Sequence, residues 1–312
     1  MSSYTEARDV AGAVAAMAAG ARPVAGGTDL VVGARHGKAP LPESLVGIHR
    51  IPGLAEISES DGVIRIGSLT THASILASAA LRASASGLLD ASSIVGSRAT
   101  RANGTLGGNV MNASPAMDTG APLLCHGAVV VLTGPSGTRR VTLDELWTGP
   151  GRTSASPDEL MEALELPVPP SGSGSAYVRL QYRRQMEIAV VGAAAYVELD
   201  GDLITTARVA ITALTPVICR VPAAEAALVG HRLDANRTPA GGFSADLGQT
   251  AAITAAGEAA AAAATPISDV RASATYRSAM AAVVARRAIA AAVRRAAGDA
   301  VTIPASDWSE QR

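Results

Sequence analysis

The spacing of apolar residues over residues 1–55 predicts a small α/β lobe. Apolar side chains recur at helical spacing over residues 5–19, with Thr5 as the expected N-cap, at four positions: Val10, Ala13, Val14 and Met17. Short apolar runs at residues 22–25 and 45–48 predict strands. We therefore expect a first lobe in which a helix packs on short strands.

The next stretch alternates apolar and polar positions and predicts a second lobe over residues 56–170. Apolar residues flank the Asp61-Gly62 turn with period two, which is a hairpin signal. The expected segments are a hairpin at 57–66, helices at 71–80 and 87–93, a second hairpin formed by 128–132 and 139–143, and a strand at 159–167 toward the edge of the lobe.

A stretch rich in Pro, Gly and Ser at residues 167–175 is the expected linker to a third domain. Beyond it the strand patterns precede the helical patterns, which favours an antiparallel sheet with helices over a parallel doubly wound sheet. Strands are expected at 177–180, 189–199 and 203–213, and helices at 223–228, 250–263 and 276–296. We expect this domain over residues 176–297 and a tail at 298–312.

Two Gly-rich turns carry the most specific chemical signal. They are Ala25-Gly26-Gly27-Thr28-Asp29-Leu30 and Gly104-Thr105-Leu106-Gly107-Gly108-Asn109. Because glycine has no Cβ, backbone N–H groups in such turns can approach an anion closely. One Gly-Gly pair is most often a structural turn, but two fit a cradle for the pyrophosphate of a dinucleotide. Neither is a Rossmann or Walker A sequence, and the pattern predicts no helix directly after Gly27.

The composition indicates a soluble enzyme subunit, because 48% of the 312 residues are hydrophobic and charged residues interrupt every long apolar stretch. We expect no membrane span, no signal peptide and a cytoplasmic location. The formal net charge of -1 makes nucleic acid an unexpected partner. Cys125 and Cys219 lack CxxC spacing and the histidines are scattered, so we expect two buried structural thiols and no metal site.

The second turn lies within a longer motif that resembles one protein family. The motif is Asn103-Gly104-Thr105-Leu106-Gly107-Gly108-Asn109-Val110-Met111-Asn112-Ala113-Ser114-Pro115-Ala116-Met117-Asp118. Together with the first turn, residues 182–191 and the Tyr276-Arg277 start of the last helical pattern, it resembles the FAD-binding, or medium, subunit of the molybdenum hydroxylases. That family includes xanthine dehydrogenases, carbon monoxide dehydrogenases and aldehyde oxidoreductases. The resemblance covers almost the whole chain in the same order.

This resemblance implies a fold and a set of cofactor contacts. The implied fold is α+β: a two-lobed FAD-binding domain of the PCMH type, followed by a C-terminal α+β domain with an antiparallel sheet and helices. The implied FAD contacts are Ala25, Gly26, Gly27, Thr28, Asp29 and Leu30 in the first turn, Thr105, Leu106, Gly107, Gly108 and Asn109 in the second, and Asn112, Ser114, Asp118, Leu166 and Tyr182 beyond them.

The family pattern also implies a role for each group of contacts. The two turns would hold the phosphates, Asn112, Ser114 and Asp118 would lie near the ribityl and ribose portions, and Leu166 and Tyr182 would lie beside the flavin ring. Asp118 could instead cap a helix before Gly120, because Asp is a favoured capping residue. Tyr182 could instead be a strand residue packed against the third domain.

The sequence contains no nucleophile–base pair, so we expect no catalytic residue and no metal ligand on this chain, and the flavin would supply the chemistry. The resemblance implies that the chain accepts electrons from a [2Fe-2S] small subunit and passes them to an external acceptor. A large subunit with the molybdenum cofactor would hydroxylate the substrate, in a dimer of heterotrimers. Two alternatives stay open: a self-sufficient FAD-dependent reductase on the same fold, and a flavin-free assembly protein.

Overall fold

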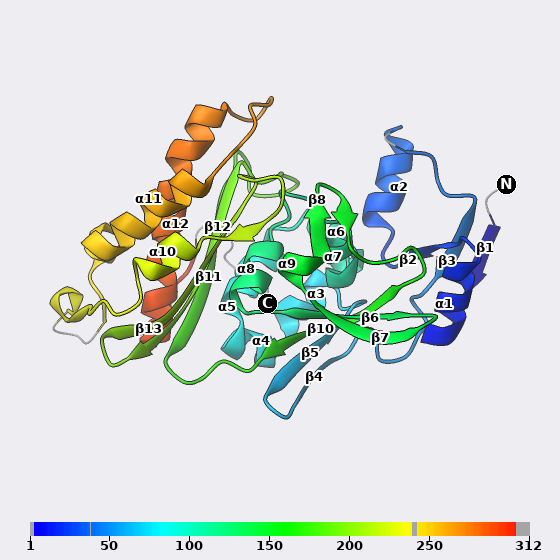
Figure 1. The fold of residues 1–312 in the computed structure, drawn as a ribbon, viewed down its shortest axis with the longest axis horizontal. Coiled ribbons are helices and arrows are strands. Elements are labelled where there is room, and N and C mark those ends of the chain that lie inside the picture. The colour runs from blue at the N-terminus through cyan, green and yellow to red at the C-terminus, as the bar shows by residue number, and fades with distance from the viewer. Residues whose placement is uncertain (1–2, 38, 239–241, 304–312) are drawn as a thin grey trace.

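Three parts lie side by side in the computed structural model, which describes residues 3–37, 39–238 and 242–303 (Figure 1). The N-terminal lobe lies at one end, a middle lobe follows, and the C-terminal part with its long helices lies at the other end. The tail predicted at residues 298–312 lies mostly outside the described residues, the last of which is Ile303.

The N-terminal lobe is built on a three-stranded parallel sheet in the order β1-β3-β2. Its elements are β1 (Ser3–Glu6), α1 (Val10–Ala18), β2 (Arg22–Val24), α2 (Thr28–Arg35) and β3 (Ser44–Gly47). The predicted apolar face of α1 is buried: Ala13, Val14 and Met17 pack with Val46 of β3 in a small core. Burial of this stripe fixes the helix on the sheet.

The first helix begins later than predicted. Thr5 is not its N-cap, because Thr5 lies in β1 and pairs with Val46 of β3. Asp9 caps α1 instead, and its Oδ1 accepts a 2.7 Å hydrogen bond from the N–H of Gly12. Threonine is common both in strands and at helix N-caps, so the pattern alone did not separate the two.

Helix α2 directly follows Gly27, so the prediction that no helix begins there is wrong. Leu30, Val31 and Val32 are consecutive apolar residues, which is not the spacing of one helical face. No residue of α2 is buried, so this helix has no apolar stripe by which the sequence could reveal it.

The middle lobe contains a five-stranded antiparallel sheet in the order β4-β5-β10-β6-β7. Its strands are β4 (Ile57–Ser60), β5 (Val63–Gly67), β6 (Val129–Gly134), β7 (Gly137–Thr142) and β10 (Leu160–Pro167). Both hairpins were predicted, but the prediction that the strand at 159–167 lies toward an edge is wrong. Strand β10 is central because it pairs with β5 on one side and β6 on the other.

Short helices link the strands of the middle lobe and bury its apolar residues. They are α3 (His72–Ala77), α4 (Ala79–Ser84), α5 (Ser86–Ser93), α6 (Arg98–Asn103), α7 (Leu106–Met111), α8 (Gly120–Cys125) and α9 (Leu143–Leu146), with a small ribbon of β8 (Trp147–Gly149) and β9 (Arg152–Thr153). Helix α5 is buried along nearly its whole length.

The thiol of Cys125 is buried as predicted, whereas Cys219 is only half-buried.

The C-terminal part contains a four-stranded antiparallel sheet in the order β11-β12-β13-β14. Its elements are β11 (Ser173–Leu180), β12 (Val191–Asp200), β13 (Leu203–Thr212), β14 (Cys219–Arg220), α10 (Pro222–Ala226), the 3-10 helices η1 (Asp234–Asn236) and η2 (Ala245–Gln249), α11 (Ala251–Ala263) and α12 (Ala274–Ala296). Helix α12 covers the outer side of this sheet, and α11 packs against α12 (Figure 1).

Both faces of the β11-β12-β13 sheet are covered, because the middle lobe packs on the face opposite α12. Side chains on the inner face join the core of the middle lobe: Tyr177, Ala194, Tyr196 and Ala210. Their neighbours on the outer face join the core beneath α11 and α12: Ala176, Val178, Ala195 and Val209. An antiparallel sheet with two buried faces is apolar at consecutive positions, as these strands are.

The predicted linker at residues 167–175 is partly wrong, because β11 already begins at Ser173. Gly174 lies directly against α12, where a Cβ would overlap the backbone of Ala292 and Ala296. The Gly and Ser residues here allow close packing of a strand on a helix, and a composition of this kind is also typical of flexible linkers.

Asp90 and His126 are among the residues whose buried polar contacts join the middle lobe to the C-terminal part. Asp90 of α5 forms a double ion pair with Arg295 of α12, at 2.6 and 3.0 Å, and accepts a 3.1 Å hydrogen bond from the N–H of Tyr177. His126, just after α8, lies 3.1 Å from the Oγ of Ser175 through its Nε2. Burial, and to a smaller extent Arg208, lowers the pKa of His126 from 6.5 to about 4.

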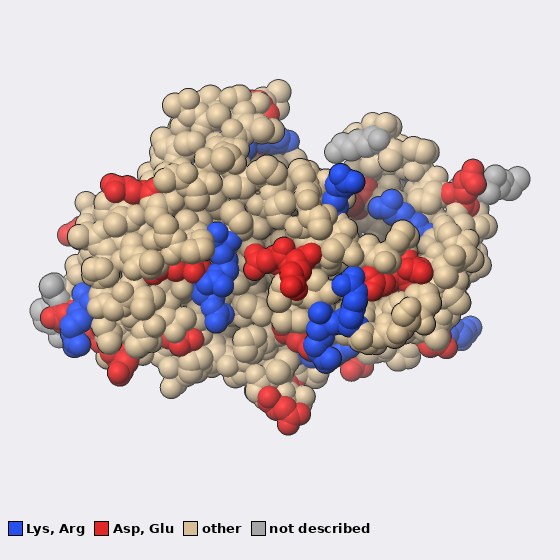
Figure 2. Space-filling view, in the orientation of Figure 1, with Lys and Arg blue, Asp and Glu red and all other residues tan. Residues whose placement is uncertain are grey.

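Charged residues of both signs are distributed in small separate groups over the face shown in Figure 2. No large field of one sign appears on this face, which agrees with the net charge of -1. None of the helices in the described parts of the chain has the length and hydrophobicity needed to cross a bilayer.

Replacing Asp90 should destabilise the chain strongly. Asp90→Ala leaves Arg295 buried without its carboxylate, so the free energy of unfolding should fall by about 3–5 kcal/mol. Urea denaturation measures the change. The control is Asp234→Ala, which removes a pair with Arg232 that is 65% exposed on both sides, and it should move the midpoint far less. Equal losses in the two variants would contradict the assigned role.

His126 should make the stability of the chain depend on pH. The unfolded chain binds a proton at this side chain below pH 6.5, whereas the folded chain binds it only below about pH 4. The contribution of about 3 kcal/mol is therefore present above pH 6.5 and is lost as pH falls toward 4. His126→Gln should flatten the plot of unfolding free energy against pH in this window, and an unchanged slope would refute the assignment.

Candidate functional site

The two Gly-rich turns lie against each other although they come from different lobes. A Cβ at Gly26 would overlap the carbonyl oxygen of Asn103, just before the second turn. A Cβ at Gly104 would lie 3.5 Å from the Oγ1 of Thr28, in the first turn. The turns therefore meet backbone to backbone, and this contact requires glycine at position 26.

The first turn ends in a helix N-terminus that has no side-chain cap. Gly27 is the N-cap of α2 with a φ of 68°, and it contributes no side-chain acceptor. The first N–H groups of a helix have no partner within the helix, and the helix dipole makes this end attractive to anions. None of the six predicted residues from Ala25 to Leu30 is buried, and Gly26 and Asp29 are exposed. This end of α2 can accept a phosphate.

The N–H groups of the second turn from Leu106 to Asn109 are already hydrogen-bonded within the chain. Leu106 donates to the carbonyl of Thr70 (2.9 Å), Gly107 to the carbonyl of Ser68 (2.9 Å), Gly108 to the Oγ1 of Thr105 (3.1 Å) and Asn109 to the carbonyl of Thr105 (3.0 Å). A Cβ at Gly107 would overlap Ser68, so this glycine allows close packing. Gly108 is exposed. The second turn therefore offers a surface without side chains rather than a set of free N–H donors.

Asn109, at the end of the second turn, and the residues that follow it occupy different environments. Asn109 accepts a 2.6 Å hydrogen bond at its Oδ1 from the Oγ1 of Thr119, and the Oγ of Ser114 accepts one from the N–H of Ala116 (3.3 Å). Asn112 is the exposed C-cap of α7. Asn112 and Ser114 therefore lie in the segment that directly follows the second turn.

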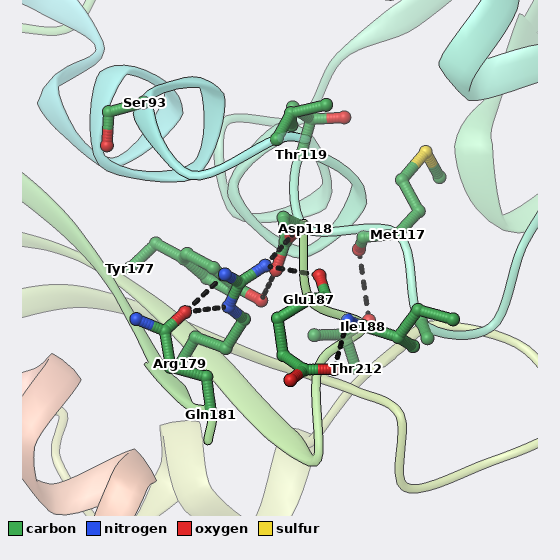
Figure 3. Close-up of polar contacts among 12 residues, drawn as sticks. Ser93, Met117, Asp118, Thr119, Tyr177, Arg179, Gln181, Glu187, Ile188 and Thr212 are labelled. Carbon is green, nitrogen blue, oxygen red and sulfur yellow. Dashed lines mark hydrogen bonds and ion pairs between the residues drawn. The ribbon is translucent and has the colours of Figure 1, made fainter. Parts of the chain in front are cut away.

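Asp118 is the centre of a buried polar network (Figure 3). Its Oδ1 accepts from the hydroxyl of Tyr177 and its Oδ2 accepts from Nη1 of Arg179, both at 2.7 Å. Burial raises the pKa of Asp118 to about 6, against the opposing effects of Arg179 and Tyr177. Asp118 is not a helix cap, because the N-cap of α8 is Thr119. Its predicted contact with a ribose stays a prediction.

Arg179 extends this network to the segment that follows β11. Its Nε and Nη2 donate to the Oε1 of Gln181, and its Nη1 also donates to the carbonyl of Glu187 at 3.3 Å (Figure 3). The side chain of Arg179 is fully buried. No local sequence pattern indicates this role, because Asp118 and Arg179 are far apart in the chain and only the fold brings them together.

Two predicted flavin neighbours do not lie in the turns. Leu166, which is 1% exposed, pairs with Ile64 at the centre of the middle sheet and belongs to its core. Tyr182 is 69% exposed, lies outside the strands, and donates from its hydroxyl to the carbonyl of Arg271. A contact of either residue with a flavin ring stays a prediction.

Comparisons with known proteins identify the family. Residues 1–169 match the FAD binding domain in molybdopterin dehydrogenase, and residues 176–241 and 244–292 match the CO dehydrogenase flavoprotein C-terminal domain. The chain belongs to the FAD-binding medium subunits of the molybdenum hydroxylase family, as its motifs predicted.

Relatives and solved structures support this membership over nearly the full length. The chain is 33% identical to the carbon monoxide dehydrogenase medium chain of Afipia carboxidovorans, covering 90% of this chain and 93% of the relative. It is 31% identical to the xanthine dehydrogenase FAD-binding subunit of Escherichia coli O157:H7, covering 70% and 76%. A structure of reconstituted CO dehydrogenase from Oligotropha carboxidovorans superposes with a TM-score of 0.86 at 32% identity, covering 95% and 98%. The two-lobed FAD-binding fold with a C-terminal α+β domain is thus confirmed.

Closing the space at Gly26 should weaken FAD binding. Gly26→Val would force the first turn away from the carbonyl of Asn103, so we expect the dissociation constant for FAD to rise at least about tenfold. Flavin fluorescence titration of the apoprotein measures it. The control is Gly33→Ala in α2, where an added Cβ meets no atom within 4 Å, and it should bind FAD like the wild type. Wild-type affinity in Gly26→Val would contradict the role of this contact.

Proposed function

We propose that this chain binds one FAD across its two Gly-rich turns and acts as the electron-transfer subunit of a multi-subunit molybdenum hydroxylase. The observation that carries the proposal is the backbone contact between Gly26 and Asn103, which joins the turns of the two lobes into one site. The uncapped N-terminus of α2 beside this contact supports an anionic ligand. Membership in the FAD-binding family supports FAD as that ligand.

The residues on either side of this contact have complementary roles in the proposal. The N–H groups at the start of α2 and the hydroxyl of Thr28 would bind the pyrophosphate, and the bare surface at Gly108 would let the cofactor lie close to the backbone. Asp118 is held in place by Tyr177 and Arg179 and would orient the segment near a ribose. When bound, FAD supplies the redox chemistry, and this chain supplies binding, orientation and electrostatics.

The names of two relatives support partner subunits for this chain. Relatives named as the medium chain of carbon monoxide dehydrogenase and the FAD-binding subunit of xanthine dehydrogenase are parts of larger enzymes. In the proposal, a small subunit with [2Fe-2S] clusters delivers electrons, a large subunit with the molybdenum cofactor hydroxylates the substrate, and this chain passes the electrons to an external acceptor. A dimer of heterotrimers in the cytoplasm is the assembly that we propose.

The purified chain tests the division of labour directly. We expect an absorption spectrum with flavin bands, release of FAD on heating, and no oxidation of purines, aldehydes, N-heterocycles or carbon monoxide by the chain alone. Tagged chain expressed in its own host should co-purify with iron–sulfur and molybdenum subunits. A colourless chain that takes up no added FAD would refute the proposal and favour an assembly protein. Substrate turnover by the isolated chain would favour a self-sufficient flavoenzyme.

A further inference from the structure

A row of buried polar groups lies directly beside the second turn, in the segment that joins β5 to α3. The carbonyls of Ser68 and Thr70 accept hydrogen bonds from Gly107 and Leu106, and the N–H of His72 donates to the carbonyl of Gly104 at 3.1 Å. These residues are all buried, yet three side-chain atoms have no hydrogen-bond partner among the described residues: the Oγ of Ser68, the Oγ1 of Thr70 and the Nδ1 of His72. Buried polar atoms without a partner are rare and indicate a missing one.

A buried cation accompanies this row. Arg101 of α6 is only 3% exposed, and its Nη1 donates a 3.1 Å hydrogen bond to the carbonyl of Val95. Within the described parts of the chain, no carboxylate forms an ion pair with it. A guanidinium carries five N–H donors and is costly to bury without a counter-charge. An anionic group of a bound ligand would supply this counter-charge.

Helices α3 and α6, which carry His72 and Arg101, pack against each other. Burial, and after it the positive charge of Arg101, lowers the pKa of His72 to about 4, so the imidazole is neutral near pH 7 and can donate one N–H. A Cβ at Gly104 would lie 3.6 Å from the Cδ2 of His72 and 3.5 Å from the Oγ1 of Thr28. His72 and the start of α2 thus approach the same glycine from the two lobes.

We propose that Arg101 and His72 bind a phosphate group of the dinucleotide, as the side-chain donors of the second turn. This inference rests on the proposed FAD site and assigns two residues that neither Gly-rich motif contains as ligands. The N–H groups from Leu106 to Asn109 already form hydrogen bonds within the chain. In this proposal, side chains of the middle lobe therefore supply the donors and the positive charge that a pyrophosphate requires. The guanidinium supplies the positive charge and the imidazole a directed donor.

Comparison of FAD with riboflavin tests this assignment, because riboflavin carries no phosphate. Arg101→Met in the full-length apoprotein should raise the dissociation constant for FAD about tenfold to hundredfold and leave that for riboflavin nearly unchanged. Arg101→Lys should retain part of the FAD affinity, and His72→Gln should lose several-fold. The matched control is Arg98→Met in the same helix, where the side chain is exposed and FAD affinity should not change.

Each outcome separates this inference from the proposed function. Wild-type FAD affinity in Arg101→Met, or equal losses for FAD and riboflavin, would show that the guanidinium is only structural. If far-UV circular dichroism shows that Arg101→Met does not fold, then Arg101→Lys and His72→Gln decide, and unaltered FAD affinity in both overturns the assignment. Failure of the wild-type chain to bind FAD would instead refute the proposed function itself.

Discussion

The contact between the two Gly-rich turns is the constraint on which the candidate site depends. The carbonyl of Asn103 lies where a side chain of residue 26 would be, so the N-terminal and middle lobes can approach only because that residue is glycine. This approach sets the uncapped N-terminus of α2 beside Gly104. One steric condition thereby joins the helix end that would attract the anionic cofactor in our proposal to the turn that would let it lie close to the backbone.

Buried polar groups fix the middle lobe, which carries the second turn, on the C-terminal part. Asp90 joins α5 to α12, and Asp118 joins the end of the second motif to Arg179 of β11. Both ion pairs connect residues of the middle lobe to the C-terminal part, and both lie beside Tyr177. The C-terminal sheet therefore supports the middle lobe with one face while α12 covers the other.

The sequence predicted most elements because their apolar periodicity matches the side that they bury. The hairpins around Asp61-Gly62 and residues 134–137 are examples, as is the buried face of α1. Prediction from the sequence failed where the buried positions of an element do not follow its apolar periodicity. Helix α2 buries nothing, so its three consecutive apolar residues did not indicate a helix, and the Gly-Ser stretch at 173–175 is a strand because Gly174 packs on α12.

By itself, the sequence determined the family, the cofactor and the two turns, because short glycine motifs specify backbone geometry that few other chains need. Only the tertiary structure decided what surrounds them. It showed that N–H groups of the second turn are already hydrogen-bonded within the chain, that Asp118 is paired with Arg179, and that Arg101 is buried on a helix packed against that of His72, without a carboxylate partner among the described residues. These facts depend on which distant segments meet in space, and local sequence patterns do not record such long-range contacts.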